Sequence, residues 1–340
     1  MGKPLSIEQA DIKSRGYAIE ARLYAEDASN NFLPVTGKIH RFAWPELEGL
    51  RVETAVQSGS EISIFYDPMI AKLIVWDEDR ASTHRKLAYV LRRLQCLGLK
   101  TNQDFLLQLL EHPDFLAGQY NTHFIAEEMN LDQLSKAESH AQDFAAIAST
   151  LINWKEREQS RTLLRSLPSG WRNSFYEAQR VGYLAGEQEL QLRYHKQASG
   201  FAFEVEDRAY QVNLVESTDD LVRLEINGVQ YPFHWVKAGA QFYLQQESLG
   251  SLFVEEMDRF PSQETEEVSG GYVAPMPSQV VKILVQAGQQ VLAGQELIVL
   301  SSMKMENTLT ATGDGVVAEI YAEEGGNVPA GFLLLQLNNE

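Results

Sequence analysis

Cysteine, long apolar runs and positive charge are all scarce in this 340-residue sequence. Its one cysteine, Cys96, cannot form an internal disulfide, so nothing indicates the disulfide framework of a small secreted protein. No apolar run approaches the roughly 20 residues that span a bilayer. The chain has 29 Lys and Arg residues against 47 Asp and Glu residues, a formal net charge of -18. Because such a surface repels phosphates and anionic lipid, we expect neither a nucleic-acid nor a membrane partner.

The first part of the chain, to about residue 128, alternates strand and helix signals. The stretches expected to form strands are residues 16–27, 37–44, 50–56 and 69–76. A long amphipathic helix is expected over residues 80–97, with Cys96 as a buried packing residue. A second helix, over residues 101–112, opens with a Thr/Asn cap and ends before Pro113. The alternation predicts an α+β unit.

The middle of the chain changes from a helical to a strand pattern. Residues 130–160 read as helix, and "DFAAIASTLINW" within them has an apolar face wide enough to be buried. From residue 172 to 256, apolar and polar residues alternate in seven or eight short runs. Hairpin turns are expected at Asn227-Gly228, Glu206-Asp207 and Gly239-Ala240. This pattern predicts a small antiparallel β-barrel or strongly curled sheet with one helix.

A polar, acidic stretch, "DRFPSQETEEVSGG" at residues 258–271, follows the strands. Its composition is typical of a flexible tether. As a coil its 14 residues would span about 20 Å, and stretched they would reach about 45–50 Å.

The last part of the chain contains an internal repeat. Residues 274–300 align with residues 311–337 at a constant offset of 37, without a gap. The identical pairs include Gly288 with Gly325, Gly294 with Gly331 and Leu300 with Leu337. Each half reads strand, Gly turn, short strand, Ala-Gly turn, strand. Two such halves, each with one apolar face, predict a two-layer β-sandwich.

The segment between the two halves is "SSMKMENTLT", residues 301–310. Pseudo-twofold packing would place this joint in a tight, exposed hairpin, where Lys304 is presented to a modifying enzyme. From residue 266 onward the only bases are Lys282 and Lys304. With Met303 and Met305 on either side of Lys304, the joint resembles the biotinyl domain of biotin-dependent carboxylases. That resemblance implies biotin in amide linkage on Lys304. It also implies that the biotin protein ligase and partner sites contact the two methionines.

Two other interpretations of Lys304 stay open. A lone turn lysine is usually unmodified, although here the repeat and the Met-Lys-Met joint argue against that. Lipoyl domains share the fold but usually carry Asp-Lys at this point, so Met303 favours biotin over lipoate.

The first part of the chain resembles the C-terminal subdomain of biotin carboxylase. The resemblance is carried by "RGYAIEARLYAED", "FLPVTGKIHRF", "LRVETAV", "YDPMIAKLIVW" and "GLKTNQDFL". It implies that Arg51, in "LRVE", faces biotin and bicarbonate and stabilises the biotin enolate. A guanidinium is always charged and offers a rigid fork to oxyanions. The alternative for Arg51 is a strand arginine in a surface ion pair.

The resemblance also shows what the sequence lacks. In this family an ATP-grasp core precedes this region and supplies the nucleotide-binding and metal-binding residues, and no such stretch is present. There is no P-loop pattern, and the 7 histidines have no ligand-like spacing, so no metal site is expected. We therefore expect ATP, Mg²⁺ and bicarbonate to act only in a longer subunit, and this chain alone to be inactive in the ATP step.

The middle part resembles the linking domain of acyl-CoA carboxylase α-subunits. "LPSGWRNS", residues 167–174, is its most recognisable piece. In that family a helix inside a β-barrel docks the α-subunit onto a carboxyltransferase β-subunit. Trp171 and Trp235 are candidate interface anchors, because aromatic residues are enriched at interface hot spots, and barrel packing is the alternative for each.

Together these features predict an α+β multidomain chain. We expect a biotin carboxylase C-terminal subdomain at 1–128, a linking β-barrel at 135–257, a tether at 258–271 and a biotinyl carrier domain at 272–340. The predicted function is that of a biotin carrier and partial biotin carboxylase in an acyl-CoA carboxylase α-subunit. Its expected partners are a carboxyltransferase β-subunit, a biotin protein ligase and an ATP-grasp part.

The alternative function is a non-catalytic carrier and docking protein that works with a separate ATP-grasp chain. Propionyl-CoA, methylcrotonyl-CoA and geranyl-CoA all remain open as substrates. The expected location is the cytoplasm in a bacterium, or the mitochondrial matrix in a eukaryote.

Overall fold

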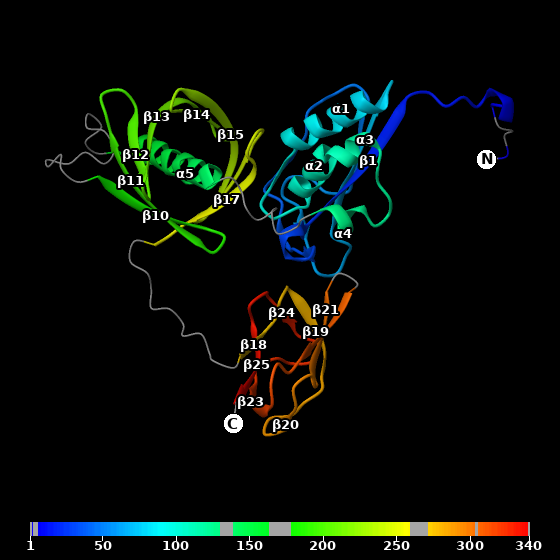
Figure 1. Ribbon diagram of the computed structural model, residues 1–340. Coiled ribbons are helices and arrows are strands. Elements are labelled where there is room, and N and C mark those ends of the chain that lie inside the picture. The colour runs from blue at the N-terminus through cyan, green and yellow to red at the C-terminus, as the bar shows by residue number, and fades with distance from the viewer. Residues whose placement is uncertain are drawn as a thin grey trace.

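The computed structural model describes residues 2, 6–129, 139–162, 178–258, 271–302 and 305–338. Figure 1 shows three bodies along the chain: a mixed domain that contains α1 to α4, a barrel around α5, and a β-sandwich that contains β18 to β25. The α+β multidomain class expected from the sequence is confirmed. Within the described residues, no helix combines the length and the apolar character that crossing a membrane requires.

The first domain packs a three-stranded antiparallel sheet, in the order β1-β8-β6, against two helices. The elements that frame it are β1 (Tyr17–Tyr24), β5 (Arg41–Ala43), β6 (Leu50–Thr54), β8 (Met69–Asp77), α1 (Arg80–Arg93), β9 (Gln95–Leu97), α2 (Gln103–Glu111), α3 (Pro113–Ala117) and α4 (Phe124–Glu128). Shorter elements are η1 (Gln9–Asp11), β2 (Glu26–Asp27), η2 (Ala28–Asn30), β3 (Leu33–Pro34), β4 (Gly37–Lys38) and β7 (Glu61–Ile62). The inner face of the sheet buries Leu23, Leu73 and Val75 in one core with Leu87 and Leu91 of α1.

The long helix expected over residues 80–97 is shorter in the structure. Helix α1 ends at Arg93, and Gln95–Leu97 form β9, which pairs with β5 and sets Cys96 opposite Phe42. Tertiary pairing thus overrides the helical periodicity at this end. Cys96 is buried as expected, and burial raises the pKa of its thiol to about 12.

The second helix, α2, begins after Asn102. The Asn102 side chain does not cap this helix; its Oδ1 accepts from the Tyr24 amide at 2.9 Å and its Nδ2 donates to the Arg22 carbonyl at 3.1 Å. Of the expected Thr/Asn cap, Thr101 Oγ1 accepts from the Gln103 amide at 3.3 Å, whereas Asn102 bonds to the edge of β1.

The second domain is a closed eight-stranded antiparallel barrel. Its strands are β10 (Gln179–Ala185), β11 (Gln188–Lys196), β12 (Phe201–Val205), β13 (Arg208–Ser217), β14 (Leu221–Ile226), β15 (Val229–Ala238), β16 (Gln241–Gln246) and β17 (Gly250–Glu256). The three expected hairpin turns are confirmed, and Asn227 and Gly228 have φ of 50° and 85°.

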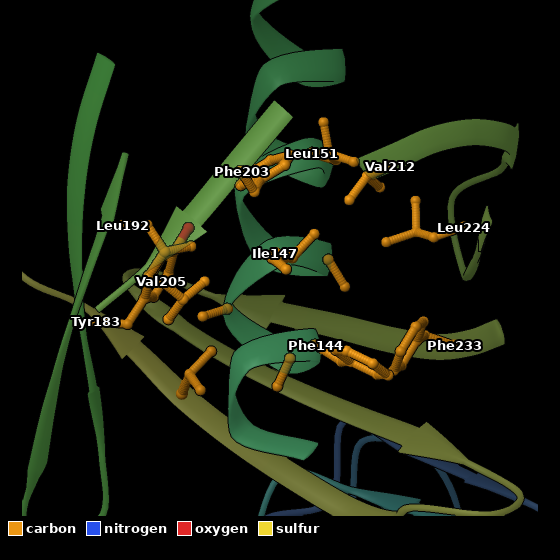
Figure 2. Close-up of a cluster of buried hydrophobic side chains, with 14 of the residues drawn as sticks. Phe144, Ile147, Leu151, Tyr183, Leu192, Phe203, Val205, Val212, Leu224 and Phe233 are labelled. Atoms are coloured by element: carbon orange, nitrogen blue, oxygen red, sulfur yellow. The ribbon is translucent and has the colours of Figure 1, made fainter. Parts of the chain in front are cut away.

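Helix α5 (Ser139–Ser160) runs through this barrel. Figure 2 shows Phe144, Ile147 and Leu151 on α5 packed among inward-pointing side chains of the strands, such as Phe203 and Phe233. The helix meets a complete ring of apolar side chains, which explains why the apolar face of "DFAAIASTLINW" is wide.

Polar contacts fix α5 at both ends of its buried stretch. Asp143 is fully buried; its Oδ1 lies 2.8 Å from Arg208 Nη2, and its Oδ2 accepts from the Tyr210 hydroxyl at 2.6 Å. Toward the other end, Asn153 Nδ2 donates to Glu256 at 2.6 Å. A buried polar group satisfied at each end sets the position of the helix along the barrel axis.

The third domain is a sandwich of two four-stranded sheets, in the orders β18-β25-β23-β20 and β22-β21-β19-β24. Its strands are β18 (Gly271–Val273), β19 (Ser278–Ile283), β20 (Gln290–Val291), β21 (Glu296–Ser302), β22 (Met305–Thr310), β23 (Gly315–Ile320), β24 (Asn327–Val328) and β25 (Leu333–Asn338). The predicted two-layer sandwich is confirmed.

Candidate functional site

The internal repeat of the last domain closes on itself through reciprocal hydrogen bonds. The Gly288 amide donates to the Val317 carbonyl at 2.7 Å, and 37 residues on, the Gly325 amide donates to the Val280 carbonyl at 2.8 Å. The Gly294 amide donates to the Ala311 carbonyl at 2.7 Å, and its counterpart, the Gly331 amide, donates to the Ala274 carbonyl at 2.8 Å. All four glycines have positive φ, between 76° and 83°, which suits glycine at these turns. The pseudo-twofold arrangement places the joint between the halves in the β21–β22 hairpin.

Strands β21 and β22 pair up to the last residues of that hairpin, with Ser302 opposite Met305. Ser302 is 5% exposed, and its hydroxyl donates to the Pro277 carbonyl at 2.8 Å, which fastens the end of β21 to the sandwich. Met303 and Lys304 follow directly and lie outside the described residues; Met305 is the first residue of β22. The described strands therefore bring the chain to a hairpin end at the sequence position of the candidate lysine.

Arg51 lies in the middle of β6, on the outer face of the first domain's sheet. Its side chain is 70% exposed, and its Nη2 is 3.3 Å from Glu53 Oε1. Glu53 also lies 3.2 Å from Lys72 Nζ. The ion pair considered from the sequence is present. Exposed pairs contribute only about 0.2–1 kcal/mol to stability, so the stability of the fold alone does not account for an arginine at this position. An exposed guanidinium on an open sheet face can reach an anionic ligand.

Glu53 and Lys72 accompany Arg51 on this face and were not expected from the sequence. Arg51 and Glu53 are two residues apart on one strand and so share a face. Lys72 stands directly opposite Glu53 on β8. The two-residue spacing of Arg51 and Glu53 indicates a shared face from the sequence alone. The position of Lys72 opposite Glu53 is known only once the strands are paired in the fold.

A metal centre is not formed by the described part of the chain, where no group of three or more His, Cys, Asp and Glu side chains is placed to hold an ion. Of the two candidate interface anchors, Trp235 is partly buried against the barrel core, and Trp171 lies outside the described residues. Most of the tether expected at 258–271 also lies outside them.

Each of the three domains matches a known family. Residues 20–127 match the biotin carboxylase C-terminal domain, residues 141–259 match the methylcrotonyl-CoA carboxylase alpha-subunit BT domain, and residues 272–337 match the biotin-requiring enzyme family. The order and limits of these matches follow the three bodies of the structure. A biotin-requiring domain implies covalently bound biotin.

Relatives match over the length of the chain. The mitochondrial methylcrotonoyl-CoA carboxylase subunit alpha of Mus musculus is 30% identical over 355 residues, covering 100% of this chain and 49% of the relative. The human mitochondrial propionyl-CoA carboxylase alpha chain is 29% identical and covers 99% of this chain and 48% of the relative. A crystal structure of the biotin carboxylase subunit of pyruvate carboxylase is 38% identical over 38% of this chain and 29% of that chain, with a TM-score of 0.38.

These domains and relatives define a component of the biotin-dependent carboxylases. More narrowly, the chain belongs with the biotin-containing alpha subunits of acyl-CoA carboxylases and corresponds to their C-terminal portion. It spans about half the length of the curated relatives it matches, and the ATP-grasp portion is absent from it.

Proposed function

We propose that this chain carries biotin on Lys304 and moves a carboxyl group between two active sites of an acyl-CoA carboxylase. The observation that carries the proposal is the β21–β22 pairing, which reaches Ser302 opposite Met305, the two residues that precede and follow Met303 and Lys304 in the sequence. Attached biotin would supply a ureido nitrogen that accepts a carboxyl group from an ATP- and bicarbonate-dependent step. Its acceptor would be an acyl-CoA on a carboxyltransferase β-subunit.

The sandwich fits a carrier role because of what surrounds the hairpin. The matched family is one that requires biotin, and the described strands on either side pair with each other in one sheet, where β21 also pairs with β19. The other lysine of this part of the chain, Lys282, is exposed within β19 and its neighbours pair with β21. A strand lysine is a poorer substrate for a modifying enzyme than one in a hairpin joint, because its backbone is held in the sheet.

Arg51 is the residue of this chain that we assign to the chemistry of the first site. Its fixed positive charge on the open face of the sheet would stabilise an enolate oxygen in a site completed by the ATP-grasp part. Mg²⁺, ATP and bicarbonate would bind in that part, because the described residues hold no metal-ligand cluster.

The barrel is proposed to dock on the carboxyltransferase β-subunit. The support is its match to a methylcrotonyl-CoA carboxylase BT domain and the rigid anchoring of α5 within it. A tether of 14 residues at 258–271 could then let the carrier domain reach two sites and keep the carboxyl group at high effective concentration at both. Methylcrotonyl-CoA and propionyl-CoA are the favoured substrates, because the relatives that match nearly all of this chain include α-subunits of both enzymes.

A second candidate is a carrier and docking protein without a catalytic part of its own. It would work with a separate ATP-grasp chain. In that case Arg51 would still complete the partner's site, or would serve only its ion pair with Glu53.

The test is transfer of labelled carboxyl to this chain. Biotinylated chain is incubated with MgATP, ¹⁴C-bicarbonate and a biotin carboxylase shown to carboxylate free biotin. We expect label on the wild-type chain and none on Lys304→Arg, and none on the wild type when the added carboxylase is omitted. Label that persists on Lys304→Arg, or no label on the wild type while free biotin is carboxylated, would contradict the proposal.

A further inference from the structure

The barrel and the first domain meet along a seam at the turn between β16 and β17. Gln245 Nε2 donates to the carbonyl of Arg92, at the end of α1, at 3.1 Å. Beside it, Arg93 Nη2 lies 3.0 Å from Glu247 in the turn. The two contacts join the C-terminal end of α1 to the end of β16 and to the turn that follows it.

A second group of contacts extends this seam to the neighbouring strands. Arg41 of β5 forms an ion pair with Asp220 of the barrel at 2.9 Å. The rings of His40 and Tyr243 face each other at 6.1 Å. The ion pairs along the seam are partly exposed, and contacts of this polar kind are typical of domain interfaces that open and close reversibly.

At this seam the start of β17, just after the β16–β17 turn, lies against Asp104 in the first turn of α2. The backbone amide of Ser251 faces the Asp104 carboxyl and lowers its pKa, against the effect of burial. Gly250, with φ of 77°, packs its Cα against the same carboxylate, and a Cβ added there would lie 2.8 Å from Asp104 Oδ1. Only a residue without a side chain fits this position while the seam is closed.

Among the described residues, no cation offsets the effect of burial on the pKa of Asp104. Burial raises its pKa to about 6, and the one opposing influence is the Ser251 amide. The charged or titratable groups on the packed elements α1, α2 and the turn, besides Asp104 itself, are Arg80, His84, Arg85, Lys86, Tyr89, Arg92, Arg93, Glu111 and Glu247. The two arginines at the end of α1 that borders the turn are engaged elsewhere: Arg92 pairs with Glu111, and Arg93 with Glu247.

We propose that the β16–β17 turn is a protonation-sensitive latch that holds the barrel on the first domain by closing over Asp104. The proposal concerns the position of the barrel and stands apart from the function of Lys304. In the open state Asp104 would be solvated and its pKa would return to the ordinary value near 3.8. The closed state therefore binds the proton more tightly than the open state.

The sign of the pH dependence follows from that difference. As pH falls through 6 the closed state takes up a proton that the open state does not hold, so closure becomes more favourable. The closing equilibrium should rise about tenfold between pH 7.5 and pH 5. At neutral pH the latch is at its weakest, so the barrel can part from the first domain while each keeps its own core.

The test measures the separation of the two domains across this pH range. Cysteines are placed at two exposed strand positions, Ala18→Cys in the first domain and Glu204→Cys in the barrel, and labelled for energy transfer. Cys96 stays unlabelled because it is buried and its thiol pKa is raised to about 12. We expect the closed fraction of the full chain to increase as pH falls from 7.5 to 5, and Asp104→Asn to stay closed throughout.

A second pair of variants tests the geometry without relying on titration. Gly250→Ala should open the seam at every pH, because its Cβ meets Asp104. Gly239→Ala is the matched control: Gly239 also has positive φ, 64°, in a hairpin turn of the same barrel, with nothing within 4 Å of an added Cβ. The latch is refuted if the wild-type separation does not change with pH, if Asp104→Asn follows the wild-type profile, or if Gly250→Ala behaves as Gly239→Ala does.

Discussion

Arg51 Nη2 lies 3.3 Å from Glu53 Oε1 on the open face of the first domain's sheet. Both side chains are largely exposed, and Glu53 is shared with Lys72 at 3.2 Å. The pair therefore places Arg51 without burying it. This arrangement suits a guanidinium that must exchange one anionic partner for another when a ligand arrives.

Replacing Arg51 separates a chemical role from a structural one. In a system completed by the ATP-grasp part, we expect Arg51→Ala to lower the rate of biotin carboxylation by about 10²–10³, as loss of one charge-stabilising donor does. Thermal unfolding should change by no more than about 0.5 kcal/mol, as is usual for exposed sites. The checks are carboxyl transfer and calorimetry on the same preparation.

Arg22→Ala is the matched control for that experiment. Arg22 is an exposed arginine on β1 of the same sheet, with its own carboxylate partner, Glu20, at 3.0 Å. Equal rates for the two variants would show that Arg51 has no special part in the chemistry.

Removing Asp143 tests how α5 is held in the barrel. Asp143→Ala leaves Arg208 and the Tyr210 hydroxyl without their buried partner, and it should destabilise the barrel by about 1–3 kcal/mol. The exposed pair of Arg223 and Glu216, at 3.2 Å on the same barrel, provides the comparison. Glu216→Ala should change stability by less than about 1 kcal/mol. Urea unfolding followed by barrel tyrosine and tryptophan fluorescence measures both, and equal effects would argue against a buried anchor.

Two glycines of the first domain test the pairing of β5 with β9. Gly98 has φ of 127°, and a Cβ there would press against the Lys38 carbonyl and lie 2.8 Å from the His40 amide. Gly59 has φ of 94° but open space around it. We expect Gly98→Ala to destabilise this region by clearly more than the roughly 1 kcal/mol typical of an incompatible φ alone. Hydrogen exchange of residues 41–43 and 95–97 should speed up in Gly98→Ala and change little in Gly59→Ala; the reverse order would refute the close approach.

The sequence predicted the elements whose local pattern agrees with their tertiary environment. The period-two runs became the eight barrel strands, and the wide apolar face of "DFAAIASTLINW" became a helix ringed by strands. The repeat with its offset of 37 residues predicted the two-layer sandwich, whose halves the structure joins through the reciprocal bonds of Gly288 and Gly325. In each case a residue pattern that can be seen within a short stretch of the chain indicated the structure.

Where distant segments compete, local pattern was insufficient. Residues 95–97 continue a helical pattern but pair with β5, and Asn102 serves the edge of β1 in place of capping α2. The local sequence around Asp104 likewise does not indicate its contact with Gly250, which lies almost 150 residues further along the chain. The functional roles of Arg51 and Lys304 stay predictions, and so do the limits of the domains.

The central claim is best tested by an intact mass of the protein purified from cells that contain a biotin ligase, with peptide mapping of residues 283–322. We expect one biotin adduct, on Lys304, retained in Lys282→Arg and lost in Lys304→Arg. An unmodified Lys304 in cells that biotinylate other carriers would contradict the account, and a lipoyl adduct at that residue would assign the carrier to a different group of enzymes.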